Sequence, residues 1–303
     1  MLIKEHIKTY SISWLAGSYD KELAMGVVEN YYIPESIDEL KDLCTELYAK
    51  KESFRIVGHT SNVYFQSDTN IKHLISTKKL NKWDVKEGYI TCECGVNVKS
   101  LAWAMVEEEV EGFAGLVDLP GTIGGAIYGN ASVSHYSIAG LLESVHMLCD
   151  DATIKEIHYE DFDFRQRSSA LKRNEMSGVI LSCRLRMQKG DGNKIVKEAS
   201  AIHNWRMKNQ PGPSNNLGTT ILLGKRSLYG LFLSSLVFLL NIKEVKAKTD
   251  FILKRVNASE LSPFLFGMNR YLWKNAEAHK LFPKYVRIIK KLYKSPKLEI
   301  EIW

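Results

Sequence analysis

The sequence predicts an α+β protein with two or three subdomains, on three observations. Strand-like alternating segments and amphipathic helical segments are mixed along the first two thirds of the chain. The stretch PGPSNNLG at 211–218 is rich in proline, glycine and asparagine, which is typical of a loop or a domain junction. After it the chain becomes helical and lysine-rich, and it ends on the alternating strand KLEIEIW, 297–303. Mixed elements followed by a helical block and a closing strand favour an α+β architecture.

The first half of the chain contains three predicted groups of elements. ESIDELKDLCTELYAK, 35–50, begins with the capping box Ser36–Glu39 and continues at helical spacing. SFRIVGHTSNVYFQSD, 53–68, indicates a strand, a tight loop and a strand. YITCECGVNVKSLAWAMVEEE, 89–109, predicts a strand, a glycine turn and a helix that Asn97 opens.

The second half continues this mixture up to the junction. SVHMLCDDATIKEIHY, 144–159, predicts a hairpin with Asp150 and Asp151 at its turn. GVILSCRLRMQ, 178–188, alternates as a half-buried strand does. The helix predicted over 194–210 must end before Pro211, because the residue before a proline disfavours helical geometry.

The bulk composition is that of a globular protein in a reducing compartment. The chain has 303 residues, of which 45% are apolar and 25% charged. The N-terminus is too polar for a signal peptide, and the cysteines are odd in number without zinc-site spacing, which favours reduced core residues and a cytoplasmic location. The cysteines are Cys44, Cys92, Cys94, Cys149 and Cys183.

Two segments of the C-terminal block carry most of its apolar and basic character. LYGLFLSSLVFLLNI, 228–242, contains a glycine and two serines and is short for a membrane span, so it predicts a buried helix. The net charge is +6, and the excess is strongest in KYVRIIKKLYKSPK, 284–297. This segment would attract nucleic acid or acidic lipid, but it contains no nucleic-acid motif, and a solvated helix face is the favoured interpretation.

A glycine-rich stretch at 115–132, GLVDLPGTIGGAIYGNAS, suggests a phosphate-binding turn. Missing side chains leave backbone N–H groups accessible, a threonine adds a hydroxyl, and a following helix N-terminus adds a favourable dipole. The alternative is a tight turn with close helix packing. The candidate residues are Pro120, Gly121, Thr122, Ile123, Gly124 and Gly125.

A second loop, VGHTSN at 57–62, joins two predicted strands. It offers one glycine, two hydroxyls and an amide, which would suit a second phosphate. A plain turn between strands explains the same residues. The candidates are Gly58, His59, Thr60, Ser61 and Asn62.

The two loops together resemble those of the UDP-N-acetylenolpyruvoylglucosamine reductase family, also called UDP-N-acetylmuramate dehydrogenases, among the vanillyl-alcohol-oxidase-like flavoproteins. The family pattern glycine-x-glycine-serine-asparagine corresponds to Gly58–Asn62. The pattern IPGTVGGAVYMNAG corresponds to LPGTIGGAIYGNAS, 119–132, and the family's glycine turn to CECGVNVKSLA, 92–102. The resemblance extends over roughly 20–303 and is densest over 54–220.

The resemblance implies a two-subdomain FAD-binding fold of the vanillyl-alcohol-oxidase type and a smaller substrate-binding α+β domain. The corresponding boundaries are 1–72, 73–212 and 213–303. It also implies a protein that binds FAD, takes hydride from NADPH and reduces an enolpyruvyl UDP-sugar. We expect a monomer with no nucleic-acid partner and no membrane span. Gly95, Asn130 and Ile180 join the two loops as implied cofactor-binding residues.

Catalytic and substrate-binding roles also follow from the resemblance. The family pattern F-x-Y-R-x-S matched to FDFRQRSS places Arg165 at the catalytic and substrate-binding arginine. RMKNQP supplies Arg206 and Gln210 for the substrate. Thr219 stands where the family has its catalytic serine, and Glu301 matches the family's glutamate. Arg165 and Glu301 would stabilise developing charge, and the Thr219 hydroxyl would deliver a proton.

Departures from the family keep other functions open. Thr60 replaces a glycine, and the family's lysine-asparagine-proline after its catalytic serine is absent from GTTILLGKRS, 218–227. VKAKTDF, 245–251, replaces SEKHANF. The pattern also suits a flavin-binding relative that acts on a different nucleotide sugar in cell-surface polysaccharide synthesis, or one without catalysis. A third alternative is a non-flavin protein whose basic block binds an acidic partner.

Overall fold

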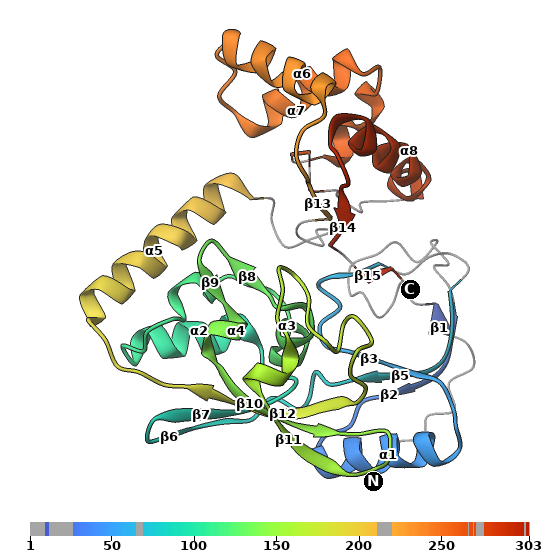
Figure 1. The fold of residues 1–303 in the computed structure, drawn as a ribbon, viewed down its shortest axis with the longest axis vertical. Helices are drawn as coiled ribbons and strands as arrows, with labels where there is room; N and C mark the ends of the chain where they lie inside the picture. The colour runs from blue at the N-terminus through green and yellow to red at the C-terminus, as the bar shows by residue number, and fades with distance from the viewer. Residues whose placement is uncertain are drawn as a thin grey trace. The chain divides into compact units, whose positions relative to one another are not determined.

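The computed structural model divides the chain into two compact units (Figure 1). It describes residues 10–11, 27–64, 69–210, 220–265, 267–268, 270, 276–299 and 301–302. The first unit contains Val28–Thr60 and Asn70–Arg206, and the second contains Ser61–Thr69 and Met207–Trp303. The loop that joins β3 to β4 therefore crosses from one unit to the other at Thr60 and Ser61.

A four-stranded sheet and a capped helix begin the first unit. The strand order is β1-β2-β5-β3, with bounds Tyr10–Ser11, Val27–Tyr32, Asn70–Ser76 and Phe54–Val57. Helix α1, Ile37–Ala49, begins as predicted, because the Ser36 hydroxyl accepts the N–H of Glu39 at 3.2 Å. Strands β3 and β5 are parallel, so the loop after β3 leaves the sheet at the edge where β5 ends.

A five-stranded antiparallel sheet forms the larger half of this unit. Its order is β11-β10-β12-β7-β6, with bounds Ile154–His158, Leu142–Leu148, Val179–Arg186, Tyr89–Glu93 and Trp83–Lys86. The predicted hairpin over 144–159 is confirmed as β10 and β11, and the Asp151 carboxylate accepts the N–H of Thr153 at 2.9 Å in the turn.

Helices and short elements complete the first unit and share its core. They are α2 Val98–Glu107, η2 Ala114–Leu116, α3 Ile123–Gly129, β8 Ser132–Val133, β9 Tyr136–Ser137, α4 Ile138–Leu141, η3 Tyr159–Phe162 and α5 Gly192–Asn209. The predicted N-cap at Asn97 and the predicted helix end before Pro211 are both confirmed. One apolar cluster includes α1, α2, α3 and the five-stranded sheet. All five cysteines are free and buried, as predicted.

The second unit has a separate apolar core. It contains α6 Leu228–Leu239, α7 Val245–Arg255, η4 Ser259–Phe264 and α8 Ala276–Leu292. The predicted closing strand is two short strands with different partners. β14, Lys297–Leu298, pairs antiparallel with β13, Ile221–Leu222, and β15, Glu301–Ile302, pairs parallel with β4, Val63–Tyr64.

The prediction that 228–242 is a buried helix is wrong about burial. The segment does form α6, but its buried residues are Gly230, Leu233 and Val237. Leu228 and Phe238 are each 83% exposed. The physical reason is the spacing: the three buried positions lie on one helical stripe, while the apolar residues between them point elsewhere. Among the described residues, no helix combines the length and the apolar character that a membrane span requires.

Candidate functional site

The two glycine-containing loops predicted from the sequence meet within the first unit. A Cβ on Gly58 would lie 2.2 Å from Oγ1 and 2.7 Å from Cγ2 of Thr122. The Thr122 side chain therefore occupies the space that any larger residue at 58 would need. This contact brings the end of β3 against the start of α3, although the two residues lie far apart in the sequence.

Thr60 has a backbone conformation that glycine adopts more readily. Its φ is +53°, in the left-handed region that favours glycine. A side chain in this region costs roughly 1–2 kcal/mol. The replacement of the family's glycine by threonine therefore leaves the loop conformation in place at a cost in stability.

His59 links the first loop to the start of α2. Its Nδ1 lies 3.3 Å from the Asn97 amide nitrogen, and the Asn97 carbonyl oxygen caps the helix by accepting the N–H of Ser100 at 3.0 Å. Desolvation lowers the pKa of the His59 imidazole, and the positive charge of Lys78 lowers it further. A neutral ring is therefore favoured, and its Nδ1 accepts a hydrogen bond from the Asn97 amide N–H.

The glycine-rich stretch uses several of its N–H groups inside the protein. Ile123 N donates to Val96 O and Gly124 N to Cys94 O, each at 2.8 Å. Gly125 N donates to the Thr122 hydroxyl at 3.3 Å. Those three groups were predicted as candidate phosphate donors, and in this fold they have internal acceptors.

Two neighbouring N–H groups remain available to an anion. Among the described residues, no acceptor is bonded to the N–H of Gly121 or Thr122. Both lie at the N-terminus of α3, where the helix dipole favours negative charge. Gly121 has φ +114°, which only glycine adopts readily. Pro120, directly before them, is exposed.

The structure explains two predicted cofactor residues without a ligand. A Cβ on Gly95 would lie 1.8 Å from the Thr77 carbonyl oxygen, so glycine is required by packing between the backbones. Ile180 lies on β12 opposite Met147 and belongs to the apolar core. Cofactor contact from either residue stays a prediction.

Asn130 ends α3 with one buried oxygen lacking a donor. Its φ of +43° is left-handed, as is common for asparagine after a helix. Its amide nitrogen donates to the Arg165 carbonyl oxygen at 2.9 Å, while Oδ1 is buried and has no hydrogen-bond partner. An unpaired buried acceptor is costly, so this atom is a candidate ligand-binding group.

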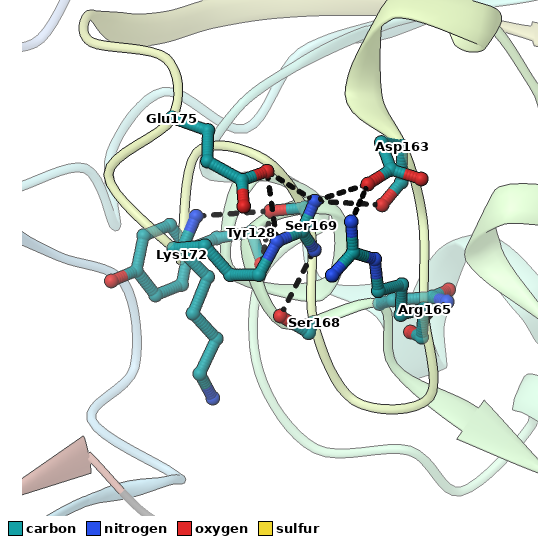
Figure 2. A network of polar contacts seen from close by, with 9 residues as sticks. Tyr128, Asp163, Arg165, Ser168, Ser169, Lys172 and Glu175 are labelled. Carbon is teal, nitrogen blue, oxygen red and sulfur yellow. Dashed lines mark hydrogen bonds and ion pairs between the residues drawn. The ribbon is translucent and has the colours of Figure 1, made fainter.

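A polar network fastens the loop after η3 to the end of α3 (Figure 2). Arg173 donates to the Asp163 carbonyl oxygen at 3.1 Å and to the Ser168 hydroxyl at 3.3 Å, and it pairs with Glu175 at 2.6 Å. The hydrogen bond from Arg173 lowers the pKa of the Glu175 carboxyl. Ser169 donates to the Tyr128 carbonyl oxygen at 2.7 Å, which connects this loop to α3.

Arg165 faces this network. Its guanidinium pairs with the Asp163 carboxylate, to which Arg173 also binds at 2.7 Å, and its side chain is 60% exposed. The backbones of Arg165 and Ser168 exchange two hydrogen bonds, at 2.9 and 3.1 Å, around a two-residue turn. The second turn residue, Arg167, has φ +56°.

Arg167 is a candidate that the sequence analysis missed. Started at Phe162, the pattern F-x-Y-R-x-S places Arg165 at its arginine but Arg167 at its serine. Started at Phe164, it places Arg167 at the arginine and Ser169 at the serine. Ser169 is fully buried. The serine at the end of the pattern was the signal that distinguishes the two registers.

The remaining predicted residues lie in or next to the second unit. The Asn62 amide donates to the Glu299 carbonyl oxygen at 3.1 Å, next to the β4–β15 pair. In that pair the Glu301 backbone is opposite Val63, while the Glu301 side chain and Thr219 lie outside the described residues. Arg206 is half-buried on α5, and Gln210 follows the end of this helix.

Comparison with known proteins gives one family model and several relatives. Residues 28–158 match the FAD binding domain model. UDP-N-acetylenolpyruvoylglucosamine reductase of Thermosipho melanesiensis is 26% identical over 282 residues, covering 92% of this chain and 90% of the relative. The enzyme of the same name from Caldicellulosiruptor saccharolyticus is 28% identical, and that from Trichormus variabilis is 30% identical.

The last two alignments cover about 60% of this chain, and the chain spans just over half the length of those relatives. The Caldicellulosiruptor alignment covers 59% of this chain and 57% of the relative, and the Trichormus alignment covers 61% of this chain and 56% of the relative. The fold is similar to the crystal structure of UDP-N-acetylenolpyruvylglucosamine reductase from Thermus caldophilus, with TM-score 0.69 at 18% identity and full coverage of both chains.

We expect the stability of this protein to depend on pH through His59. Because the folded state lowers the pKa of this imidazole, the unfolded state binds more protons as the pH falls below about 6.5, and the free energy of unfolding decreases. The decrease from about pH 7.5 to about pH 5.5 should be smaller in His59→Gln than in wild type, measured by urea unfolding. The control is His158→Gln, at an exposed strand position. Equal slopes for wild type and His59→Gln would contradict this assignment.

Proposed function

We propose that the chain is a divergent member of the UDP-N-acetylenolpyruvoylglucosamine reductase family and an FAD-dependent reductase, as its similarity to these enzymes supports. Its substrate would be a UDP-linked enolpyruvyl sugar, and its hydride source NADPH. The observation that carries the proposal is the contact between the loop at Gly58 and the start of α3 at Thr122. Both loops lie in or next to the part of the chain that matches the FAD binding domain model.

The residues of the first unit suit the phosphates and polar edges of a dinucleotide. The N–H groups of Gly121 and Thr122 would donate to a pyrophosphate at the N-terminus of α3. The buried Oδ1 of Asn130 would accept a hydrogen bond from the cofactor, which would remove an unpaired polar atom. When bound, the flavin would supply the hydride-transfer chemistry.

The chain itself must supply positive charge and a proton. An arginine on the 165–168 turn would hold the substrate carboxylate and stabilise the negative charge that develops next to it. We assign this role to Arg167, because the placement of F-x-Y-R-x-S that keeps its final serine, at Ser169, puts Arg167 at the arginine. The Thr219 hydroxyl would donate the proton, Glu301 would assist it, and Arg206 with Gln210 would bind the nucleotide sugar.

A different nucleotide sugar is the second candidate substrate. The lysine-asparagine-proline that follows the family's catalytic serine is absent from 218–227, and α7 begins with VKAKTDF in place of SEKHANF. These changes lie in the segment that would bind substrate, whereas the flavin loops are retained. We propose a monomer acting in the cytoplasm in either case, which fits five free, buried cysteines.

The purified protein should show flavin absorption near roughly 370 and 450 nm that bleaches under anaerobic NADPH. Adding the UDP-enolpyruvyl sugar should then restore the oxidised spectrum. Bleaching without reoxidation by this sugar would support the second candidate, and other UDP-sugars bearing an unsaturated carboxylate would be tried. Absence of flavin even after reconstitution with FAD would reject the proposal.

Gly125→Leu should prevent flavin binding without unfolding the protein. Gly125 is exposed, and a Cβ there would have, among the described residues, Thr122 Oγ1 at 3.4 Å as its one neighbour within 4 Å, so the larger side chain would project at the start of α3. Gly129→Leu is the matched control, because a Cβ there meets no other described residue within 4 Å at the other end of the same helix. Flavin content per protein and thermal unfolding would be measured for both. Full flavin retention in Gly125→Leu would place the cofactor elsewhere.

Substitution of the two arginines should separate their roles. Arg167→Gln should slow reoxidation of the reduced flavin by substrate by about 100-fold or more, because it removes charge stabilisation at the reacting centre. Flavin reduction by NADPH should change little. Arg165→Gln, on the same turn, should change substrate reoxidation only a few-fold. Stopped-flow absorbance measures both half-reactions, and the opposite order of effects would return the catalytic role to Arg165.

A further inference from the structure

Helix α6 carries an exposed apolar face that the core of the second unit does not use. Six of the fourteen exposed large apolar side chains among the described residues lie within residues 228–240. We call them the α6 apolar face: Leu228, Leu231, Phe232, Phe238, Leu239 and Leu240. Soluble proteins rarely expose so many large apolar residues side by side, and such patches usually mark an interaction surface.

Four cations lie at the N-terminal end of α6. Lys225 and Arg226 directly precede the helix. Lys291, in the last turn of α8, and Lys294, just after α8, lie next to them, because Lys294 N donates to Lys225 O at 2.7 Å and the Ser227 hydroxyl donates to Lys291 O at 2.8 Å. We call Lys225, Arg226, Lys291 and Lys294 the α6 basic cluster. All four are exposed, and in the described part of the chain none has a carboxylate partner.

Lys291 also shows how this cluster is held next to the helix. Its Nζ lies 5.1 Å from the centre of the Tyr229 ring, on the first turn of α6. Figure 1 shows α6 and α8 next to each other, in agreement with the backbone hydrogen bonds between Ser227 and Leu292. Unpaired positive charges therefore lie at the N-terminal end of the helix, and exposed apolar side chains run from that end to the other.

The charge of the C-terminal block indicates which kind of partner would bind the α6 apolar face. Residues 220–303 contain 16 Lys and Arg against 6 Asp and Glu, whereas the full chain has a net charge of only +6. A second copy of this chain would bring two such blocks together, and their repulsion opposes self-association. Nucleic acid would satisfy the cations, but it offers no apolar surface for the leucines and phenylalanines.

We propose that α6 and its basic cluster dock this protein on the surface of a membrane that contains anionic lipids. Leucine and phenylalanine side chains would enter the boundary between headgroups and acyl chains, while the lysines and Arg226 would bind the lipid phosphates. The helix has 12 residues, about 18 Å at 1.5 Å per residue, so it would lie along the surface. The acidic-lipid alternative considered for the basic C-terminal segment thus gains a structural basis, and it is independent of the flavin reaction.

Vesicle flotation tests the proposal with the full-length protein. Wild type should float with vesicles of phosphatidylcholine and phosphatidylglycerol, and should remain in the bottom fraction with vesicles of phosphatidylcholine alone. High salt should reduce the bound fraction, because screening weakens the attraction between cations and anionic headgroups.

Two pairs of variants separate the apolar and the basic contributions. Phe232→Ser with Phe238→Ser should reduce vesicle binding by at least about tenfold, and since both side chains are exposed the fold should persist. Ile154→Ser, a half-exposed apolar residue on β11, is the control and should bind like wild type. Lys225→Gln with Lys294→Gln should weaken binding about tenfold, while Lys194→Gln with Lys197→Gln on α5 should not. Circular dichroism and flavin content check that each variant is folded.

Four outcomes would overturn the proposal. The first is no binding of wild type to anionic vesicles. The second is equal binding by wild type and the double phenylalanine variant, which would place the membrane contact elsewhere. The third is a dimer in sedimentation velocity that the same variant dissociates, together with absence of vesicle binding, which would identify a second copy as the occupant. Binding to a duplex oligonucleotide in place of vesicles would likewise reject a lipid partner.

Discussion

The close approach of Gly58 to Thr122 is the constraint on which the candidate site depends. A loop after β3 and the first turn of α3 can meet only if position 58 lacks a side chain, because the Thr122 hydroxyl and methyl occupy that space. The same threonine caps α3 through the N–H of Gly125. One side chain thus starts the helix and sets how near the first loop comes. The Asn97 amide, which contacts His59 and caps α2, holds the other side of this loop.

Around this contact, several backbone N–H groups donate to acceptors within the protein itself. Ile123 and Gly124 donate to the β7–α2 connection, and Gly95 permits that connection to pass against residues 77–80. Part of the glycine content is therefore a packing requirement, and within residues 120–125 the donors available to an anion reduce to Gly121 and Thr122. The interpretation as a tight turn accounts for Ile123, Gly124 and Gly125, whereas a phosphate site at Gly121 and Thr122 stays a prediction.

The polar network at the 165–168 turn shows how charge is organised near the end of α3. Arg173 holds the turn through Asp163 and Ser168, and Ser169 anchors it to Tyr128 (Figure 2). Asp163 draws the Arg165 guanidinium into this network. The second unit differs again, since its cations around α6 have no such acidic partners among the described residues, which is why they remain available to an anionic surface.

The sequence by itself determined the local structure and the resemblance to a family. Capping residues Ser36 and Asn97, the turn at Asp151 and the helix end before Pro211 depend on neighbouring residues alone, and the motifs at 58–62 and 119–132 carry the resemblance to the flavin-binding reductases. Tertiary structure decided which apolar residues are buried and which arginine faces which carboxylate. The α6 run contains enough apolar residues for a core helix, but burial requires a neighbouring surface, and no periodicity within the run supplies one. The register of F-x-Y-R-x-S was readable from its final serine, and the fold adds that this serine, Ser169, is buried and bonded to the Tyr128 carbonyl oxygen.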